Sequence, residues 1–196
     1  SQIWKTGSEK TMKIFQLSGK VASDCFYHHG DMSLSNAIIN MAQKFKNNAP
    51  LLEEDGQFGS LRSPQAGAPR YIGTRLSKYF KLIYKDFDLL EFKEEEGDKI
   101  EPKYFLPIIP TILINGGSGI AVGFASNILN RNVLDVISEC EKCLRGKDPI
   151  NIPPKLNGFL GSYSQDPENP KKWIITGKLE IVNTTTIRIS ELPPSM

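Results

Sequence analysis

The chain has 196 residues, enough for one domain or two small ones with a hydrophobic core. No stretch approaches the roughly 18–20 apolar residues that span a membrane, and no charged and then apolar leader opens the sequence, so we expect a soluble, cytoplasmic protein without a membrane partner. Three cysteines are too few for a disulfide framework and indicate a reducing compartment. The formal net charge is only +2.

The charges are unevenly distributed along the chain. Between Gly56 and Lys85 every charged residue is basic, whereas the stretch from Asp86 to Glu101 is strongly acidic. The basic residues of the first stretch are Arg62, Arg70, Arg75, Lys78, Lys81 and Lys85. A surface without a charged partner usually mixes the two signs, so the basic stretch favours a polyanion such as a nucleic acid. We expect the acidic stretch to form a solvated loop.

The first part of the chain has the pattern of a winged helix-turn-helix. Residues 10–27 have a helical pattern, and a glycine break with Asp31 as an N-cap precedes a second helix. The apolar residues of this second helix recur at i, i+3 and i+4: Leu34, Ala37, Ile38, Met41, Ala42 and Phe45. The turn at Asp55-Gly56 and a second break at Gly59 indicate a short β-wing. In this fold the second helix enters the major groove of DNA.

The rest of the chain predicts a helix, a broken apolar segment and a β region. We expect a helix after Tyr71, with one apolar face: Leu76, Tyr79, Phe80, Ile83 and Phe87. The run "YFLPIIPTILINGGSGIAVGFASNIL" is interrupted by prolines and glycines, and its "TILI" has the pattern of a strand. Past Asn151 the alternating runs "KLEIV" and "TIRIS" predict an antiparallel β region. The predicted domains are therefore residues 1–88, 89–150 and 151–196.

Tyr71 is a candidate nucleophile. A tyrosine hydroxyl titrates near pH ~10, so it attacks well only where neighbouring groups stabilise the charge. Arg70, directly before it, could bind a phosphodiester and stabilise the extra negative charge of the transition state. The chain has 6 tyrosines, and ordinary packing remains the alternative role for any one of them.

The glycine-rich segment "NGGSGIAVG" has two possible roles. Gly117, Gly119 and Gly123 have the spacing GxGxxxG rather than the GxGxxG of dinucleotide-binding loops, and no Gly-Lys-Ser/Thr follows. The spacing therefore disfavours a cofactor site, and close approach of the backbone to a neighbour or a nucleic acid explains the glycines as well. Ile120 among them could be an apolar wedge that unstacks base pairs, or a core residue.

Two further clusters suggest metal or redox chemistry only weakly. His28 and His29 are adjacent, and adjacent histidines on a short segment rarely reach the same ion. Cys140 and Cys143 have the spacing of a redox motif, but they lie within a predicted amphipathic helix, away from a helix N-terminus that would lower a thiol pKa. We therefore expect no metal ligands and structural cysteines.

Several motifs, taken in order, resemble the breakage-reunion core of type IIA DNA topoisomerases. They are "YHHGD…SL…IINMAQ", "DGQFGS", "APRYIGTRLSK" and "EPKYFLPIIPTILINGGSGIAVGFASNI", and the resemblance runs from about Lys13 to Val136, with looser matches at "LNGFLGSY" and "RISELP". The sequences "YHHG" and "EPKYFLPIIPTILINGG" are similar to those of the eukaryotic enzymes, whereas "GIAVGFASNI" is similar to the bacterial sequences. The mixture most resembles the DNA-cleaving medium subunit of T-even-type bacteriophage topoisomerases.

The resemblance implies a fold and a set of site residues. The fold is α+β, a winged helix-turn-helix DNA-binding domain followed by part of a mixed α/β tower domain. Tyr71 matches the family's nucleophile, Arg70 the arginine that grips the scissile phosphate, and Ile120 the isoleucine that bends the cleaved duplex. The further residues expected to face DNA are His29, Lys13, Gln16, Arg62, Arg75 and Lys78.

The resemblance also implies a reaction and its partners. Tyr71 would attack a backbone phosphorus of double-stranded DNA, and a dimer of this subunit would cut both strands so that another duplex can pass. In this family the Mg²⁺-binding acidic cluster and the ATPase lie in other domains, and the sequence offers no candidate for either. We therefore expect Mg²⁺ and ATP to be bound by a partner subunit, and the location to be the host-cell cytoplasm if a phage encodes the chain.

Two positions depart from the family's pattern. Thr74 is followed by Arg75, where a glutamate is common, which adds positive charge and puts the local pairing in doubt. Met32 and Asn36 replace the serine and acidic pair that hold quinolone drugs through a metal-water bridge, so we expect weak quinolone trapping.

Two other functions remain as alternatives. A non-catalytic winged-helix module would bind DNA with the same salt dependence but would form no covalent adduct. An oxidoreductase built on the glycine-rich loop would have to bind a dinucleotide tightly.

Overall fold

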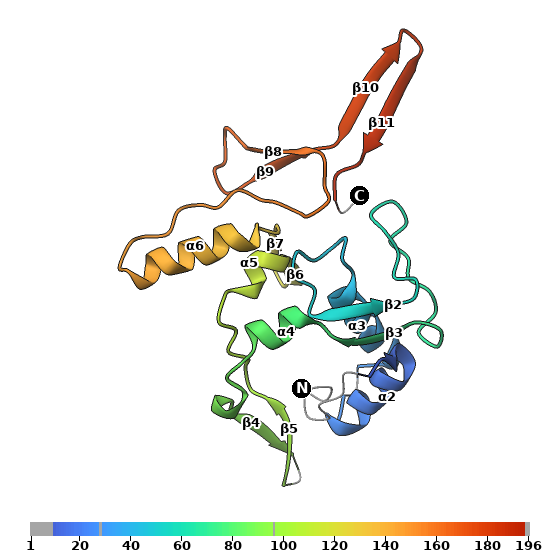
Figure 1. Cartoon of the computed structure of the whole chain (residues 1–196), viewed down its shortest axis with the longest axis vertical. Coiled ribbons are helices and arrows are strands. Elements are labelled where there is room, and N and C mark those ends of the chain that lie inside the picture. The colour runs from blue at the N-terminus through green and yellow to red at the C-terminus, as the bar shows by residue number, and fades with distance from the viewer. Residues whose placement is uncertain (1–9, 28, 96, 195–196) are drawn as a thin grey trace. The chain divides into compact units, whose positions relative to one another are not determined.

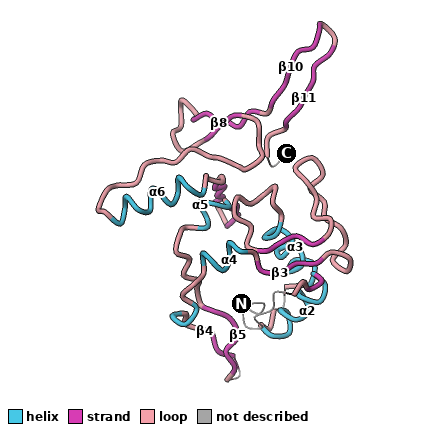
Figure 2. Tube along the Cα trace, in the orientation of Figure 1, coloured by secondary structure: helices cyan, strands magenta, loops and turns pink. Residues whose placement is uncertain are grey.

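The computed structural model describes residues 10–27, 29–95 and 97–194. They belong to two units, Ser1–Thr111 and Ile112–Met196, called unit 1 and unit 2 below. Figure 1 shows the order of the helices and strands, and Figure 2 shows the long loops between them. Within the described ranges, no helix is both long enough and apolar enough to cross a membrane.

Unit 1 begins with two helices and a small antiparallel sheet (Figure 1). The elements in chain order are β1 (Met12–Lys13), α2 (Ile14–Asp24), α3 (Asp31–Ala42), β2 (Leu52–Asp55) and β3 (Gly73–Leu76). The strand order is β1-β3-β2, so β3 lies in the middle of the sheet. Two helices followed by strands joined through a long loop confirm the predicted winged helix-turn-helix.

The core of unit 1 joins both helices to the sheet. Its buried members are Ile14, Leu17, Ile38, Ile39, Ala42, Leu52, Phe58 and Ile72. Three of them come from α3: Ile38 and Ala42 belong to the predicted apolar face, but Ile39 was not predicted, and the predicted Ala37 and Met41 are exposed. Burying one such aliphatic side chain stabilises the fold by about 1.5–3 kcal/mol, so this cluster holds α2 and α3 on the strands. The helix α3 ends at Ala42, before the Phe45 that the pattern had included.

The first helix is shorter than predicted. The pattern indicated a helix over residues 10–27, but α2 covers only Ile14–Asp24, and Met12 and Lys13 form a strand instead. Met12 pairs with Thr74 and Lys13 with Gly73. The partner strand lies some sixty residues away in the sequence, so a local pattern could not reveal this pairing.

The predicted helix after Tyr71 is also wrong at its start. Residues Gly73–Leu76 form β3, and α4 begins only at Lys78 and ends at Ile83. Ser77 separates the two elements: its hydroxyl accepts a hydrogen bond from the Phe80 amide at 3.2 Å and donates one to the Pro50 carbonyl at 2.6 Å. This N-cap fixes the start of α4 and ends the strand before it.

The acidic stretch forms a hairpin rather than the predicted solvated loop. A 3-10 turn, η1 (Phe87–Leu89), is followed by β4 (Phe92–Glu95) and β5 (Asp98–Pro102), which pair antiparallel. Lys93 bridges to Glu101 across the two strands at 2.7 Å. Such cross-strand pairs offset the repulsion between the carboxylates. Glu96, at the centre of the acidic run, lies outside the described residues.

Unit 2 contains short helices and separate two-stranded hairpins. Its elements are α5 (Thr111–Asn115), which starts at the boundary, β6 (Gly117–Ala121), β7 (Phe124–Ile128), α6 (Val133–Leu144), β8 (Ser162–Gln165), β9 (Trp173–Thr176), β10 (Lys178–Asn183) and β11 (Thr186–Glu191). The pairs β8–β9 and β10–β11 confirm the antiparallel β region. The predicted domain limits at residues 88 and 150 stay a prediction.

The run "TILI" is a helix, not the predicted strand. Pro110 precedes α5, and Gly116 follows its last residue with φ +68, the left-handed conformation that commonly ends helices. A Cβ at Gly116 would come within 2.5 Å of the Ile128 carbonyl oxygen. The glycine therefore allows the chain to leave the helix and enter the β6–β7 hairpin.

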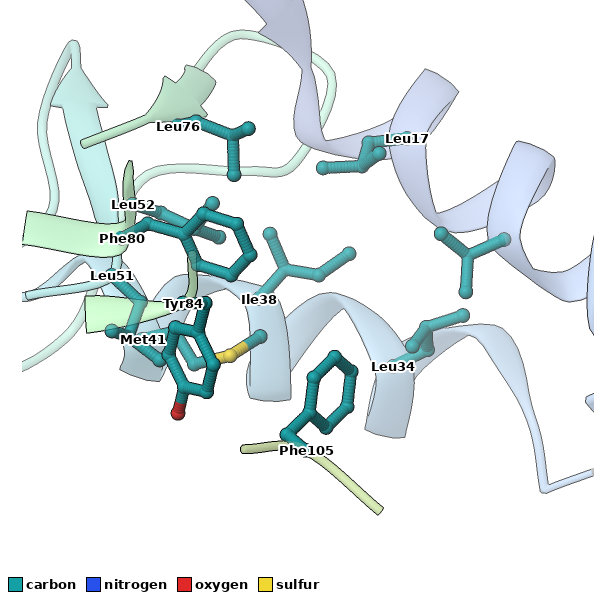
Figure 3. Close-up of a pocket in the computed structure, with 11 residues that line it drawn as sticks. Leu17, Leu34, Ile38, Met41, Leu51, Leu52, Leu76, Phe80, Tyr84 and Phe105 are labelled. Carbon is teal, nitrogen blue, oxygen red and sulfur yellow. The ribbon is translucent and has the colours of Figure 1, made fainter. Parts of the chain in front are cut away.

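The helix α3 lies between two pockets of opposite character. One, of about 410 Å³, is apolar and appears in Figure 3; its lining residues include Leu17, Leu34, Ile38, Phe80, Tyr84 and Phe105. The other, of about 570 Å³, is more polar and lies between α3 and residues 64–69; its lining includes Met32, Asn36, Asn40, Gln43, Lys46 and Gln65. The two faces of α3 therefore have different environments.

Candidate active site

Tyr71 lies at the end of the long loop between β2 and β3, residues 56–72, called the wing loop below. The two arms of this loop are tied together: the Gly67 amide donates to the Gln57 carbonyl at 2.9 Å, and Gln57 Nε2 donates to the Gln65 carbonyl at 3.3 Å. At the tip, Ser60 and Ser63 exchange backbone hydrogen bonds of 2.8 and 3.2 Å. The wing loop is therefore held together by hydrogen bonds between its two arms.

The first turn of α2 anchors the segment around Tyr71. The first amides of a helix have no partner within the helix. Here the Ile14 and Phe15 amides donate to the Ile72 and Pro69 carbonyls, both at 3.1 Å. The Tyr71 amide in turn donates to Ala68 at 2.9 Å. The backbone on both sides of the tyrosine is thus held by hydrogen bonds.

Tyr71 and its neighbour Ile72 point to opposite environments. Ile72 is 3% exposed and belongs to the core, whereas Tyr71 is 71% exposed. Gly73 follows, and a Cβ there would come within 2.7 Å of Thr11 Cγ2 and 3.2 Å of the Met12 carbonyl oxygen. The buried isoleucine and the tightly packed glycine fix the chain direction, so that the tyrosine side chain faces solvent.

Cationic groups surround the tyrosine. Lys13 Nζ donates to the Tyr71 carbonyl at 2.8 Å, although the two residues are 58 positions apart in the sequence. The Arg70 guanidinium carbon lies 5.7 Å from the centre of the Tyr71 ring, within the range of a cation–π contact. Both side chains are exposed and can reach a bound anion.

The other basic positions lie on the same unit. Arg62 is exposed in the turn at the tip of the wing loop, and Lys78 is exposed at the start of α4. Arg75 forms an ion pair with Glu53, its cross-strand neighbour in β2, at 2.6 Å. The glutamate on the neighbouring strand thus supplies the carboxylate that the local sequence lacks beside Thr74.

Two polar candidates lie on the helices or beside them. Gln16 is exposed on the first turn of α2. His29 is exposed just before α3, where its ring lies 5.4 Å from the ring of Tyr27 in an edge-to-face contact. His28, for which metal binding was considered and disfavoured, lies outside the described residues, and no group of three or more potential metal ligands occurs among the residues described.

Ile120 lies in unit 2, on the β6–β7 hairpin. Its side chain is 93% exposed, which excludes the core reading for this residue within the described structure. Phe124, on β7, is 80% exposed. Ile120 pairs with Ala125 and Ala121 with Phe124, so Ile120 and Phe124 occupy opposite faces of the hairpin. The glycine-rich segment is thus a hairpin rather than the loop-to-helix turn that a dinucleotide site requires.

The cysteines on α6 do not have the environment of a redox pair. Cys140 and Cys143 lie in the second half of α6, far from its capped start at Asn132. Burial and the neighbouring Cys143 raise the pKa of the Cys140 thiol. A raised pKa disfavours the reactive thiolate, which agrees with the expected structural role.

Sequence reasoning missed Gln43, which contacts the wing loop from the end of α3. It is buried and lies one turn after the core residue Ile39. The local sequence carried no clear signal, because Gln43 directly follows the last residue of α3 and lies outside the predicted apolar face. Its partners in the wing loop could not be identified from the local sequence.

Comparisons with known proteins identify the family of the chain. A family model for the A subunit of DNA gyrase/topoisomerase IV matches residues 2–196. Human DNA topoisomerase 2-alpha is 38% identical over 196 residues, and DNA topoisomerase 2 of Arabidopsis thaliana 40% over 198 residues; each match covers 97% of this chain and 13% of the relative. The chain thus spans about an eighth of the length of these relatives.

A solved structure has the same fold. The chain matches the crystal structure of the Plasmodium falciparum topoisomerase II DNA-binding, cleavage and re-ligation domain with a TM-score of 0.91 and 36% identity, over 98% of this chain and 27% of the other. This match confirms the α+β fold. The chain belongs to the type IIA DNA topoisomerases, in the family of the DNA gyrase/topoisomerase IV A subunits.

Proposed function

We propose that this chain is the DNA-cleaving part of a type IIA topoisomerase and that Tyr71 is its nucleophile. The observation that carries the proposal is the contrast at this position: the side chain is 71% exposed, while the backbone on both sides is held by α2 and the core. An exposed side chain on a braced backbone can reach a large substrate and still be positioned for attack.

The reaction is a transesterification, in which one phosphodiester bond is exchanged for another. The Tyr71 hydroxyl loses its proton, its oxygen forms a bond to a DNA phosphorus, and the bond from that phosphorus to the 3′ oxygen breaks. The leaving oxygen takes up a proton and becomes a free 3′-hydroxyl, and the tyrosine keeps the 5′-phosphate. Because a phosphodiester is exchanged for another, the reverse reaction reseals the strand without ATP. The cations of Arg70 and Lys13 support the charge of the transition state.

Residues of both units would contact the duplex. Helix α3 would enter the major groove, and the exposed side chains of His29, Gln16, Arg62 and Lys78 would contact the backbone. Ile120 would insert between base pairs from the β6–β7 hairpin, because an aliphatic side chain with 93% exposure has no other partner in the described part of unit 2. Arg75 would contribute less, since Glu53 already balances its charge.

The remaining components would come from outside this chain. The described residues contain no cluster of three or more acidic, histidine or cysteine side chains close enough to bind a metal ion. On the family resemblance we assign Mg²⁺ and ATP to a partner subunit or to another domain. We further propose a homodimer of this subunit, which cuts both strands. The mixture of eukaryotic-like and bacterial-like motifs supports a T-even-type phage subunit that acts in the host-cell cytoplasm.

Covalent trapping tests this function. The longest form of the subunit is mixed with its partner subunits, Mg²⁺ and labelled supercoiled DNA, and the reaction is stopped with detergent. We expect a protein–DNA adduct with the wild type, none with Tyr71→Phe, and an undiminished amount with Tyr104→Phe, a matched change at another exposed tyrosine of unit 1.

Each other outcome identifies a different error. An adduct that persists in Tyr71→Phe would assign the chemistry to another tyrosine. Salt-dependent DNA binding without any adduct in the wild type would favour the non-catalytic winged-helix module.

A further inference from the structure

Gln43 connects the end of α3 to the wing loop. Its side chain is only 2% exposed, and its Nε2 donates to two wing-loop carbonyls, Phe58 at 2.8 Å and Pro64 at 3.2 Å. Phe58 lies on the arm that leaves β2, and Pro64 lies on the arm that leads to Tyr71. One buried amide therefore bridges the two arms of the loop.

The chemistry of the bridge requires a donor. Both partners are carbonyl oxygens, so the amide nitrogen rather than the amide oxygen must face them. The Oε1 atom is buried and receives no hydrogen bond from the described residues. Leaving a buried acceptor unpaired is unfavourable. The two carbonyl contacts are thus the polar interactions that explain a glutamine at this position.

The bridge lies at a point where the wing loop is tightly packed. Gly59 has φ +85, and a Cβ there would come within 2.8 Å of the Pro64 carbonyl group. The Gly67 amide donates a hydrogen bond to the Gln57 carbonyl, and Tyr71 follows four residues later. A shift of the Pro64 arm would pass along this short segment to the nucleophile.

We propose that Gln43 is a positioning residue for cleavage, which transmits the placement of α3 on DNA to the wing loop and so to Tyr71. This inference rests on the proposed function and extends it. Gln43 is buried, so it touches neither the DNA backbone nor the reacting atoms. Its role is to hold the Pro64 arm, and therefore Tyr71, at the distance from the phosphate that attack requires.

The first test replaces the donor by an apolar group of similar length. In Gln43→Met both carbonyls lose their partner. Because a displacement of about 1 Å can lower a rate about 100-fold, we expect the single-turnover rate of adduct formation to fall roughly 10- to 100-fold. The dissociation constant for DNA should change less than about threefold, since the exposed cations remain.

The second test uses pH to switch the hydrogen-bond donor on and off. In Gln43→Glu a protonated carboxyl can still donate to one carbonyl, whereas a carboxylate would repel both. Burial raises the pKa of such a carboxyl. The cleavage rate of the variant relative to the wild type should therefore rise as the pH falls from about 9 to 6.

The charged groups around this position leave the direction of that pH dependence unchanged. Lys46 lines the same pocket, and its Nζ donates to Asn40 at 2.8 Å. Lys44, which directly follows Gln43, forms an ion pair with Glu54 on β2, with 3.3 Å between Lys44 Nζ and Glu54 Oε2. A nearby cation such as Lys46 would move the midpoint of the titration to lower pH, but protonation would still restore the bridge.

Gln65 provides the matched control. It lies on the same arm of the wing loop and lines the same pocket, but its side chain is exposed. Gln65→Met and Gln65→Glu should cleave at the wild-type rate with the wild-type pH profile.

The outcomes separate this inference from the proposed function. No adduct with the wild type would contradict the function itself. An adduct with the wild type together with a Gln43→Met rate within about threefold of it would overturn the positioning role alone. If Gln43→Met fails to fold, the Gln43→Glu profile decides, because a ratio to wild type that does not change with pH excludes the bridge.

Discussion

Gly59 offers a quantitative test of the packing of the wing loop, because the same substitution can be made at a second glycine of similar φ whose surroundings are open. Gly59 and Gly30 have nearly equal positive φ values, +85 and +87. A Cβ at Gly30 would meet no atom within 4 Å, whereas at Gly59 it would lie 2.8 Å from the Ser63 and Pro64 carbonyl oxygens. Both glycines belong to unit 1.

The two contributions can be estimated separately. A non-glycine residue held at such a φ costs about 1–3 kcal/mol, and this applies at both positions. The contacts at Gly59 are with backbone atoms that cannot rotate away, and overpacking of this kind costs about 1–3 kcal/mol more. We therefore expect Gly30→Ala to destabilise unit 1 by about 1–3 kcal/mol and Gly59→Ala by about 2–6 kcal/mol.

Hydrogen exchange provides the local measurement that this comparison needs. The slowest amides of α2 and α3 report the opening of unit 1 independently of unit 2. The difference between the variants should be about 1–3 kcal/mol. Equal destabilisation by the two variants would refute the close packing of the wing loop on itself at Gly59.

Four further changes test other parts of the site. Lys13→Met should slow adduct formation by up to about tenfold, because an exposed hydrogen bond contributes about 0.5–1.5 kcal/mol, and Lys13→Arg should recover most of the rate; equal rates in single-turnover assays would contradict this. Ile120→Ala should leave the unfolding free energy within about 0.5 kcal/mol but reduce DNA bending measured by energy transfer between the duplex ends, so unchanged bending would exclude the wedge. Hydrogen bonds from Lys142 and from a backbone amide lower the pKa of Glu139. The ionised carboxylate therefore stabilises the fold above the ordinary glutamate pKa, and this stabilisation is lost as the pH falls through the lowered pKa. Glu139→Gln should flatten the acid side of the curve of unfolding free energy against pH, and an unchanged curve would contradict this role of Glu139. Quinolones should trap little adduct with the wild type, and Met32→Ser combined with Asn36→Asp should increase trapping in a cleavage titration, whereas gyrase-like sensitivity of the wild type would refute the idea.

The sequence by itself determined the parts of the fold that depend on local patterns. The spacing of apolar residues predicted α3, the alternation in "KLEIV" and "TIRIS" predicted the strands β10 and β11, and the order of the motifs indicated the family. These signals are local because one helix face or one strand face is read from neighbouring residues. The roles of Tyr71 and Arg70 were predicted in the same way, from their chemistry and their motif, and stay a prediction.

Where the sequence misled, contacts between distant residues decided part of the structure. Gly73 and Thr74 became a strand because segments on both sides of the sheet pair with them. For "TILI", Gly116 explains where the helix ends, since a Cβ there would clash with the Ile128 carbonyl oxygen. The contact of Lys13 with Tyr71 spans 58 positions, and the bridge from Gln43 reaches a loop 15 and 21 positions away. The sequence shows which side chains can react. Their positions depend on hydrogen bonds and packing between segments that are distant in the sequence, and these contacts form only when the whole unit folds.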